Sequence, residues 1–160
     1  MRPLALSLAL AFAATLAPTA AGQPPCTAIV AFYGDGCAGS AGRAPRLELV
    51  GCPRPGAALT LAIQNGLGQA AGILVVGGDS QFFPLPGGCQ VLVLPPLTVL
   101  PVVLGGAAGE PGAGEFSLPL LVPAQPDLVG RRFNMQALVW DAGAYGSISA
   151  TDGLQFVIGK

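Results

Sequence analysis

The sequence contains no histidine and few charged residues. Asp, Glu, Lys and Arg make up 9% of its 160 residues, and seven basic residues against eight acidic ones give a net charge of −1, whereas soluble domains carry about 25% charged residues. Without His, the chain lacks the usual general base at neutral pH and the commonest metal ligand. It also lacks the clustered basic stretch that neutralises a phosphate backbone. We therefore expect no transition-metal chemistry and no nucleic-acid partner.

The composition also disfavours helices, because Gly and Pro are abundant. The 24 Gly and 16 Pro residues form a quarter of the chain, and both residue types destabilise helix interiors. Apolar residues make up 52% of the chain, which excludes ordinary polar disorder. This composition predicts a β-rich fold with many tight turns.

The N-terminus carries an apolar run that is typical of a secretory signal peptide. Arg2 precedes apolar residues 4–17, and the small residues Thr19 and Ala21 suit the positions before a cleavage site. The alternative, an uncleaved anchor, is disfavoured because the run is shorter than the roughly 20 residues that span a bilayer. We expect residues 1–21 to be a signal peptide, cleaved after Ala21.

The mature chain, residues 22–160, is expected to be a single exported domain that is secreted, periplasmic or at the cell surface. Cys26 does not directly follow the apolar run and a small residue, so a lipid anchor there is not expected. The most apolar later stretch, residues 91–104, contains three prolines and is too short to span a membrane. We therefore expect no membrane span in the mature chain.

All four cysteines lie in the expected mature chain. They are Cys26, Cys37, Cys52 and Cys89. An even number in an exported chain favours disulfides over metal ligation, and no CxxC pair is present. Free buried thiols are the alternative. Four cysteines allow three connectivities, which the spacing does not decide.

Alternation of apolar and polar residues marks several strands. Within residues 58–64, Leu59, Leu61 and Ile63 share one face. The same period recurs over residues 115–122, 132–140 and 154–158. Short Gly-, Asn- and Asp-containing segments between the apolar runs permit tight turns. The spacing predicts an all-β, antiparallel β-sandwich or jelly roll of eight to ten short strands, stapled by disulfides.

Three other runs are continuously apolar, over residues 73–76, 91–94 and 97–104. Such runs suit strands that are covered on both faces or packed under loops. Pro101 and Pro119 fall inside apolar alternation and cannot donate ladder hydrogen bonds, so the strands that carry them should be edges or bulged.

Several short motifs, taken in their order along the chain, resemble a known module. They are Gly34-Asp35-Gly36-Cys37-Ala38-Gly39-Ser40, Pro84-Leu85-Pro86-Gly87-Gly88-Cys89, Gln136-Ala137-Leu138-Val139-Trp140-Asp141 and Ser149-Ala150-Thr151-Asp152-Gly153-Leu154. Together they look like a recurrent Gly- and Pro-rich β-sandwich module of exported proteins from planctomycete-type bacteria, for which we know of no assigned activity. The resemblance implies that Cys37 pairs with Cys89, as the module's usual cysteine pair, which leaves Cys26 to pair with Cys52.

Catalytic motifs are weak throughout. The glycine cluster over residues 34–42 is not followed by Gly-Lys-Ser/Thr, so it is not a phosphate-binding loop. A glycosidase needs two suitably spaced carboxylates, but Asp35, Asp79 and Asp152 each lie beside a glycine and are typical of turns. The chain has no D-x-D-x-D-G calcium loop. We expect no enzymatic activity, no metal and no cofactor.

The most suggestive binding residues are aromatic. Trp140 and Tyr145 flank a turn that begins at Asp141, and a flat ring beside a carboxylate can stack on a sugar; adjacent Phe82 and Phe83 form a second candidate loop. The alternative is that these aromatics are packed, because large rings dominate core burial.

We expect Trp140 to be at least partly buried, against the strands that carry Phe133 or Phe156. Strict alternation argues otherwise, since it places Trp140 on the face opposite Phe133. Burial requires that a bulge or the strand's end re-aims the ring.

The sequence thus predicts a non-enzymatic exported module with a structural, adhesive or surface-display role. The alternative is a carbohydrate-binding module that uses Trp140 and Tyr145, with Asp141 beside them. A surface protein or a polysaccharide is the kind of partner that either hypothesis allows.

Overall fold

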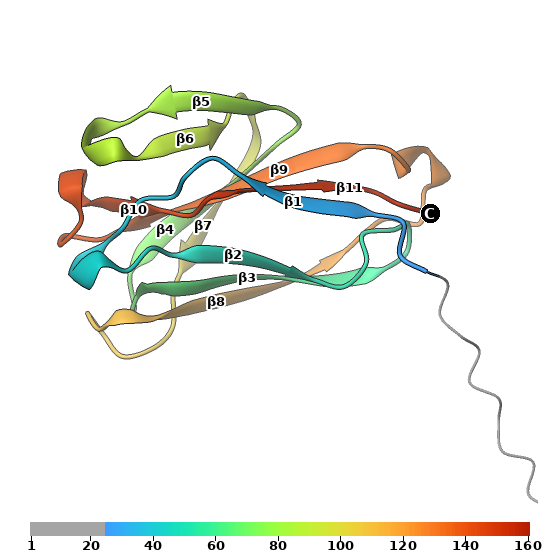
Figure 1. Ribbon diagram of the computed structural model, residues 1–160. Helices are drawn as coiled ribbons and strands as arrows, with labels where there is room; N and C mark the ends of the chain where they lie inside the picture. The colour runs from blue at the N-terminus through green and yellow to red at the C-terminus, as the bar shows by residue number, and fades with distance from the viewer. Residues whose placement is uncertain (1–24) are drawn as a thin grey trace, which may run out of the picture.

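The computed structural model describes residues 25–160, which form a β-sandwich with a third, smaller layer (Figure 1). The signal peptide that we expect over residues 1–21 lies outside the described residues. Within residues 25–160, no helix has both the length and the apolar character needed to cross a membrane.

Eleven strands occur in the described part of the chain, one more than the expected maximum, and every strand pair is antiparallel. The larger sheet has the order β1 (Ile29–Tyr33), β11 (Gly153–Val157), β9 (Arg132–Trp140), β4 (Ala71–Gly77), β7 (Pro96–Val103), and β10 (Ile148–Ala150) also pairs with β9. The smaller sheet consists of β2 (Arg46–Val50), β3 (Ala58–Leu67) and β8 (Pro111–Leu121). Strands β5 (Ser80–Pro84) and β6 (Gln90–Val93) form a separate hairpin. The predicted all-β, antiparallel class is confirmed.

The two sheets bury one apolar core between them. Leu59, Leu61 and Ile63 alternate along β3 and are all buried, as the period-two pattern predicts. From the facing sheet, Phe133 of β9 stacks on Phe156 of β11 with ring centroids 5.4 Å apart. Fully burying a Leu, Ile or Phe side chain stabilises the folded state by about 1.5–3 kcal/mol relative to leaving it exposed. The core therefore holds the strand ends, and the loops they carry, in fixed positions.

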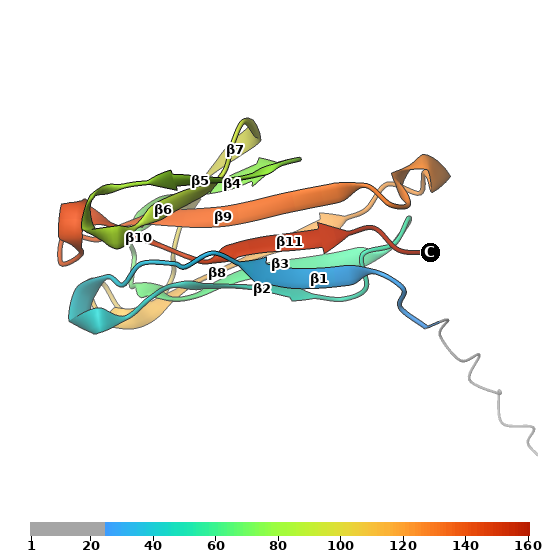
Figure 2. The same ribbon diagram turned by 45° about the horizontal axis from the view of Figure 1, so that its top comes forward.

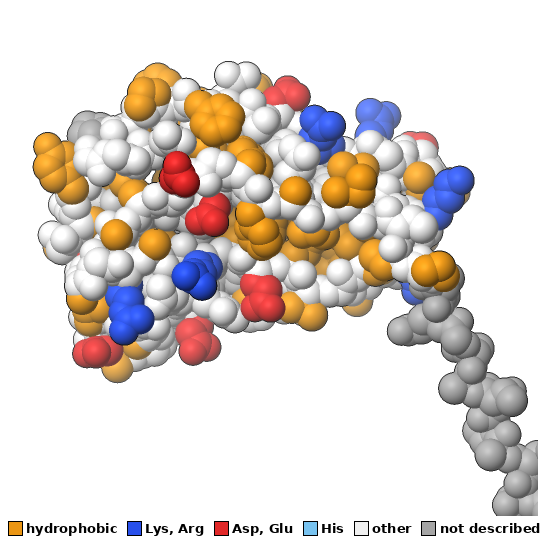
Figure 3. Space-filling model, viewed as in Figure 1, with side chains coloured by type: hydrophobic (Ala, Val, Ile, Leu, Met, Phe, Trp, Pro, Cys, Tyr) orange, Lys and Arg blue, Asp and Glu red, His pale blue; other side chains and the backbone are white. Residues whose placement is uncertain are grey.

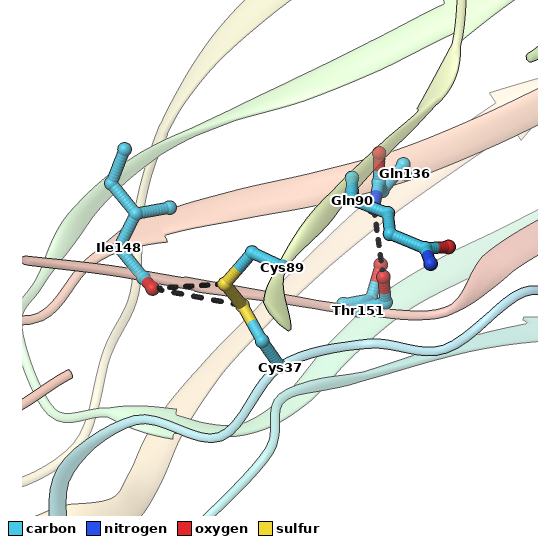
Figure 4. Close-up of a disulfide and its surroundings, with 6 residues drawn as sticks. All are labelled: Cys37, Cys89, Gln90, Gln136, Ile148 and Thr151. Atoms are coloured by element: carbon cyan, nitrogen blue, oxygen red, sulfur yellow. Dashed lines mark hydrogen bonds between the residues drawn. A yellow bond between two sulfur atoms is a disulfide. The ribbon is translucent and has the colours of Figure 1, made fainter. Parts of the chain in front are cut away.

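The β5–β6 hairpin forms a third layer on the outer face of the larger sheet (Figures 1 and 2). It is anchored by Gln136, a buried residue of β9. The Gln136 side-chain carbonyl accepts a hydrogen bond from the Leu92 N–H at 2.8 Å. Its amide donates to the carbonyls of Gln90 at 2.8 Å and Thr151 at 3.0 Å, residues that Figure 4 shows beside Gln136. The hairpin also buries Val75 on the outer face of β4. The predicted coverage of the apolar run in β4 on both faces is thus confirmed at Val75, whereas Ile73 on the same outer face is only half-buried.

Strands β7 and β8, which carry Pro101 and Pro119, lie at the edges of their sheets, as predicted. The prediction that residues 97–104 are covered on both faces is wrong, because most side chains of β7 are exposed, including Leu97 and Val103. The hairpin packs mainly on the middle of the sheet: β6 contacts β9 and β4, whereas β7 lies at the end of the strand order, beyond β4.

Two disulfides staple the fold with the connectivity implied by the family resemblance. Cys26 is joined to Cys52, and Cys37 to Cys89. The first ties the segment before β1 to the loop after β2, and the second ties the segment after β1 to the start of β6. In the chain-entropy treatment, closing loops of 26 and 52 residues stabilises the fold by about 3.5 and about 4 kcal/mol.

Candidate functional site

Trp140 is the last residue of β9 and lies half exposed, with 51% of its surface accessible. About half of its surface is covered, but the expected packing against the strands of Phe133 or Phe156 is wrong, because Trp140 lies outside the core cluster that contains both phenylalanines. Strict alternation along β9 turns Phe133 and Val139 into the core and Trp140 onto the outer face, and no bulge interrupts the pairing of β9 with β4. The hairpin that covers Gln136 farther along the same face leaves Trp140 accessible.

The Trp140 ring borders an open depression of about 500 Å³ at one end of the sandwich. Three loops form this depression: the β3–β4 turn, the segment before β8 and the β9–β10 turn, which lies at the left end in Figure 1. The lining residues are Leu67, Gly68, Gln69, Ala70, Ala108, Gly109, Trp140, Asp141, Ala142 and Ser147. The site therefore combines one large aromatic ring with small residues that leave space beside it.

Two polar residues of the depression, Gln69 and Ser147, hold unusual backbone conformations. Their φ angles are 58° and 59°, in the left-handed region that favours glycine. Both side chains are exposed. Non-glycine residues in this region cost free energy and cluster at functional sites. The two residues lie on opposite loops beside Trp140, so the rim carries one exposed carboxamide and one exposed hydroxyl.

Asp141 lines the same depression, but its carboxylate is engaged internally. The side chain is 3% exposed and accepts hydrogen bonds from the Ser40 N–H at 2.7 Å, the Ser40 hydroxyl and the Gly143 N–H at 3.0 Å. Burial raises the pKa of Asp141, but hydrogen bonds from Ser40, Gly143 and Ala144 outweigh it, so the pKa lies below its usual value. Asp141 thus fixes the β9–β10 turn that carries Trp140 against the segment around Ser40.

Tyr145 is 72% exposed and lies in the same turn, but it borders a different cleft. That cleft has a volume of about 100 Å³ and is lined by Leu85, Cys89, Tyr145, Gly146 and Ile148. The Tyr145 ring packs so closely on Gly87 that a Cβ there has no room. Beneath the cleft, the Ile148 carbonyl oxygen lies 3.6 and 3.5 Å from the two sulfurs of the Cys37–Cys89 disulfide (Figure 4). Trp140 and Tyr145 therefore border separate depressions at one end of the molecule.

Phe82 and Phe83, the second candidate pair, lie in strand β5 rather than in a loop. Both are exposed, and together with Gln81, Leu94 and Pro95 they line a shallow hollow on the hairpin. Phe82 meets the ring of Tyr33 edge-on, with centroids 6.4 Å apart. These aromatics lie apart from the Trp140 depression, since the two hollows share no lining residue.

The depression offers little for acid–base or metal chemistry. Among its described lining residues, Asp141 is the single carboxylate, and it already bonds protein donors. No group of three or more His, Cys, Asp or Glu residues within residues 25–160 is placed to hold a metal ion. What the arrangement provides is a ring face and neutral hydrogen-bonding groups.

Gln69 and Ser147 were not predicted, because the loops that carry them meet only in the folded molecule. The buried amides Asn134 and Gln136, which share the outer face of β9 with Trp140, were not predicted either. The sequence signal for them is their spacing: side chains two residues apart lie on the same face of a strand, and two carboxamides there can bond the backbone of a segment that covers this face. Asn134 indeed donates to the Gly78 carbonyl at 2.8 Å.

No family model matches the chain, and no curated protein is detectably similar to it. The resemblance to the planctomycete-type module therefore stays a prediction. Among solved structures, the chain is similar to a chitin-binding domain from Burkholderia pseudomallei, with 11% sequence identity and a TM-score of 0.33. The likeness covers 67% of this chain and 55% of that structure's chain, so it spans little more than half of that protein. A likeness of this degree shows neither a shared family nor a shared ligand.

Proposed function

We propose that this chain is an exported, non-catalytic binding module that holds a neutral carbohydrate at the Trp140 depression. The half-exposed ring of Trp140 beside an open hollow is the observation that carries this proposal. An aromatic face gains free energy by covering the apolar face of a sugar ring. The exposed polar groups of Gln69 and Ser147 supply the few placed hydrogen-bonding groups that fix a ligand's orientation.

A neutral ligand fits the charge around the site. Asp141 is the single charged residue among the lining residues and its carboxylate is buried. Over the face of the molecule in Figure 3, acidic and basic side chains both occur and are separated by uncharged surface. Such a surface has no strong field of one sign with which to attract a polyanion or polycation.

Two features support export. The N-terminal apolar run has the length and flanking residues of a signal peptide, and the two disulfides are bonds that persist in oxidising compartments. The non-catalytic assignment is supported by the single, internally bonded carboxylate of the depression, since glycoside hydrolysis generally uses a pair of carboxyl groups.

A structural or surface-display role that involves no sugar is the second candidate. The two disulfides and the exposed apolar residues of β7 favour it, because a stapled scaffold with an apolar edge is suited to packing against other surface components.

A glycan array probed with three proteins tests the proposal: the wild type, Trp140→Ala and the matched control Phe83→Ala. Phe83 is an aromatic residue of similar exposure, 55%, outside the depression. We expect the wild type and Phe83→Ala to bind the same neutral glycans and Trp140→Ala to lose at least about tenfold in affinity, since a stacked aromatic ring contributes on the order of 1.4 kcal/mol. If the wild type binds no glycan, or if Trp140→Ala binds as the wild type does, the proposal is wrong.

A further inference from the structure

The strand register extends the Trp140 site into a row of apolar side chains across the larger sheet. Ile148 of β10 pairs with Trp140, and Ala71 of β4 pairs with Val103 of β7. Because Gly72 pairs with Val139, the antiparallel register places Ala71 beside Trp140. All four residues thus share the outer face in a row that crosses four strands, or about 14 Å at the usual strand spacing.

A second row runs parallel to the first, two residues farther along the strands. Its members are Leu138 of β9, Ile73 of β4 and Pro101 of β7. Leu138 packs against the cluster around the Cys37–Cys89 disulfide, whereas Ile73 is half-buried and Pro101 is exposed. The accessible part of the two rows is therefore continuous from Trp140 toward the β7 edge. We call it the outer platform: Trp140, Ala71, Ile73, Pro101 and Val103.

The outer platform bears no charge. Strands β4 and β7, which supply most of it, contain no Asp, Glu, Lys or Arg. Exposed edge strands usually carry charged residues, which prevent pairing with other chains. An uncharged apolar face of this kind on a soluble domain marks a place where something binds, and its neutrality matches that of the Trp140 depression.

Pro101 argues against a partner strand as the occupant. The Leu104 N–H donates to the Ala70 carbonyl at 2.9 Å, so even-numbered residues of β7 direct their backbone groups toward β4 and odd-numbered residues direct theirs to the free edge. Pro101 is odd-numbered and lacks an N–H, so it interrupts the free edge near its middle. The platform is therefore protected against strand addition while its face stays open.

We propose that the outer platform is a docking surface for the flat face of an insoluble, neutral polysaccharide, with Trp140 stacked on a sugar ring at one end. This inference rests on the proposed function and extends it from a single ring to an assembled polymer face. The continuity of the platform with the depression and its lack of charge select a neutral polymer. Its regular rows on a pleated sheet suit an ordered surface better than a single flexible chain, which the depression alone can accommodate.

Binding to insoluble particles, compared with binding to soluble oligosaccharides of the same polymer, tests this inference. The probes are cellulose, chitin and β-1,3-glucan particles together with their soluble oligomers. The decisive variant is Val103→Asp, which places a charge on the platform at a side chain that is 66% exposed. Its matched control is Val50→Asp, on the edge strand β2 of the other sheet, where Val50 is 54% exposed. Thermal unfolding shows whether both variants remain folded.

We expect Val103→Asp to weaken particle binding by about tenfold or more, because an unpaired carboxylate must lose water against a neutral surface. Binding of the soluble oligomer should be unchanged, and Val50→Asp should match the wild type in both assays. If Val103→Asp binds particles as the control does while Trp140→Ala does not bind, the platform is wrong and the Trp140 site stands.

If the wild type binds the soluble oligomers but no particles, the platform is again wrong and the Trp140 site stands. If the wild type binds neither, the proposed function fails together with this inference. If sedimentation shows a wild-type dimer that Val103→Asp dissociates, the platform is a contact between copies of this chain and the proposal is overturned.

Discussion

Replacing Asp141 with Asn tests how the turn that carries Trp140 is held. The carboxylate accepts hydrogen bonds from the Ser40 N–H, the Ser40 hydroxyl and the Gly143 N–H while only 3% exposed. In Asn, one oxygen becomes an NH2 group, which cannot accept from a donor. One oxygen meets the Ser40 N–H and the other meets Ser40 Oγ and the Gly143 N–H, so either amide orientation leaves at least one backbone donor unsatisfied.

These contacts determine how much stability Asp141→Asn should lose. An unsatisfied buried donor costs about 1–3 kcal/mol, and hydrogen bonds to a charged acceptor are stronger than neutral ones. We expect Asp141→Asn to lower the free energy of unfolding by about 2–3 kcal/mol near neutral pH, a fall in Tm of roughly 6–12 °C for a domain of this size. The exposed turn residue Asp79 provides the control, and Asp79→Asn should stay within about 0.5 kcal/mol of the wild type.

The difference in stability between the wild type and Asp141→Asn should depend on pH. The folded-state pKa of Asp141 is below its usual value, so the stability that the carboxylate contributes is complete above the unfolded pKa of about 3.9 and is lost as the pH falls through the lower, folded pKa. Thermal unfolding of the wild type and Asp141→Asn from pH 7 to pH 2 should show the gap in Tm narrowing below about pH 4. A gap that stays constant over this range, or an Asn variant as stable as the wild type at pH 7, would refute this account of the turn.

Three further outcomes are expected. Replacing Cys26 and Cys52 together with Ser should reduce the free energy of unfolding in urea by about 3.5 kcal/mol, and an unchanged midpoint would contradict the stapling role. Gln136→Leu should destabilise the protein by about 2–4 kcal/mol, because it leaves the Leu92 N–H and two carbonyls under the hairpin without a hydrogen-bond partner. Hydrogen exchange at the Leu92 amide should become faster, and unaltered exchange would count against this role of Gln136. N-terminal sequencing of exported protein should begin at or near Gly22, and recovery of the chain with its first residue intact would sink the signal-peptide prediction.

Much of the sandwich could be predicted because several strands alternate apolar and polar residues. Residues 132–140 place Phe133, Met135, Ala137 and Val139 on one face, and β9 has these bounds. Pro101 and Pro119 located two edge strands, since Pro cannot donate within a ladder. The third layer could not be predicted, because Asn134 and Gln136 are polar and alternation alone assigns them to solvent. Their burial depends on tertiary contacts: Gln136 bonds the hairpin backbone at Leu92, and Asn134 bonds the Gly78 carbonyl in the segment that leads into the hairpin.

The candidate site was found in part. Alternation assigns Trp140 to the outer face, whereas the free energy gained by burying a large ring, up to about 3 kcal/mol, favours burial. That gain is partial in the structure, because about half of the ring's surface is covered without the ring entering the core. Gln69 and Ser147 carry no sequence signal, since their left-handed conformations and their common depression arise only when distant loops meet.

The fluorescence of Trp140 during titration with a neutral oligosaccharide tests the central claim most directly. Trp140 is the one tryptophan of the chain, so its emission reports on the proposed site without interference. The free protein should show red-shifted emission that iodide quenches readily, as the exposed ring implies. Adding a glycan that the array identifies should shift the emission saturably and protect the ring from iodide. Saturable glycan binding, measured by calorimetry, that leaves both the emission and the quenching of Trp140 unchanged would contradict the claim.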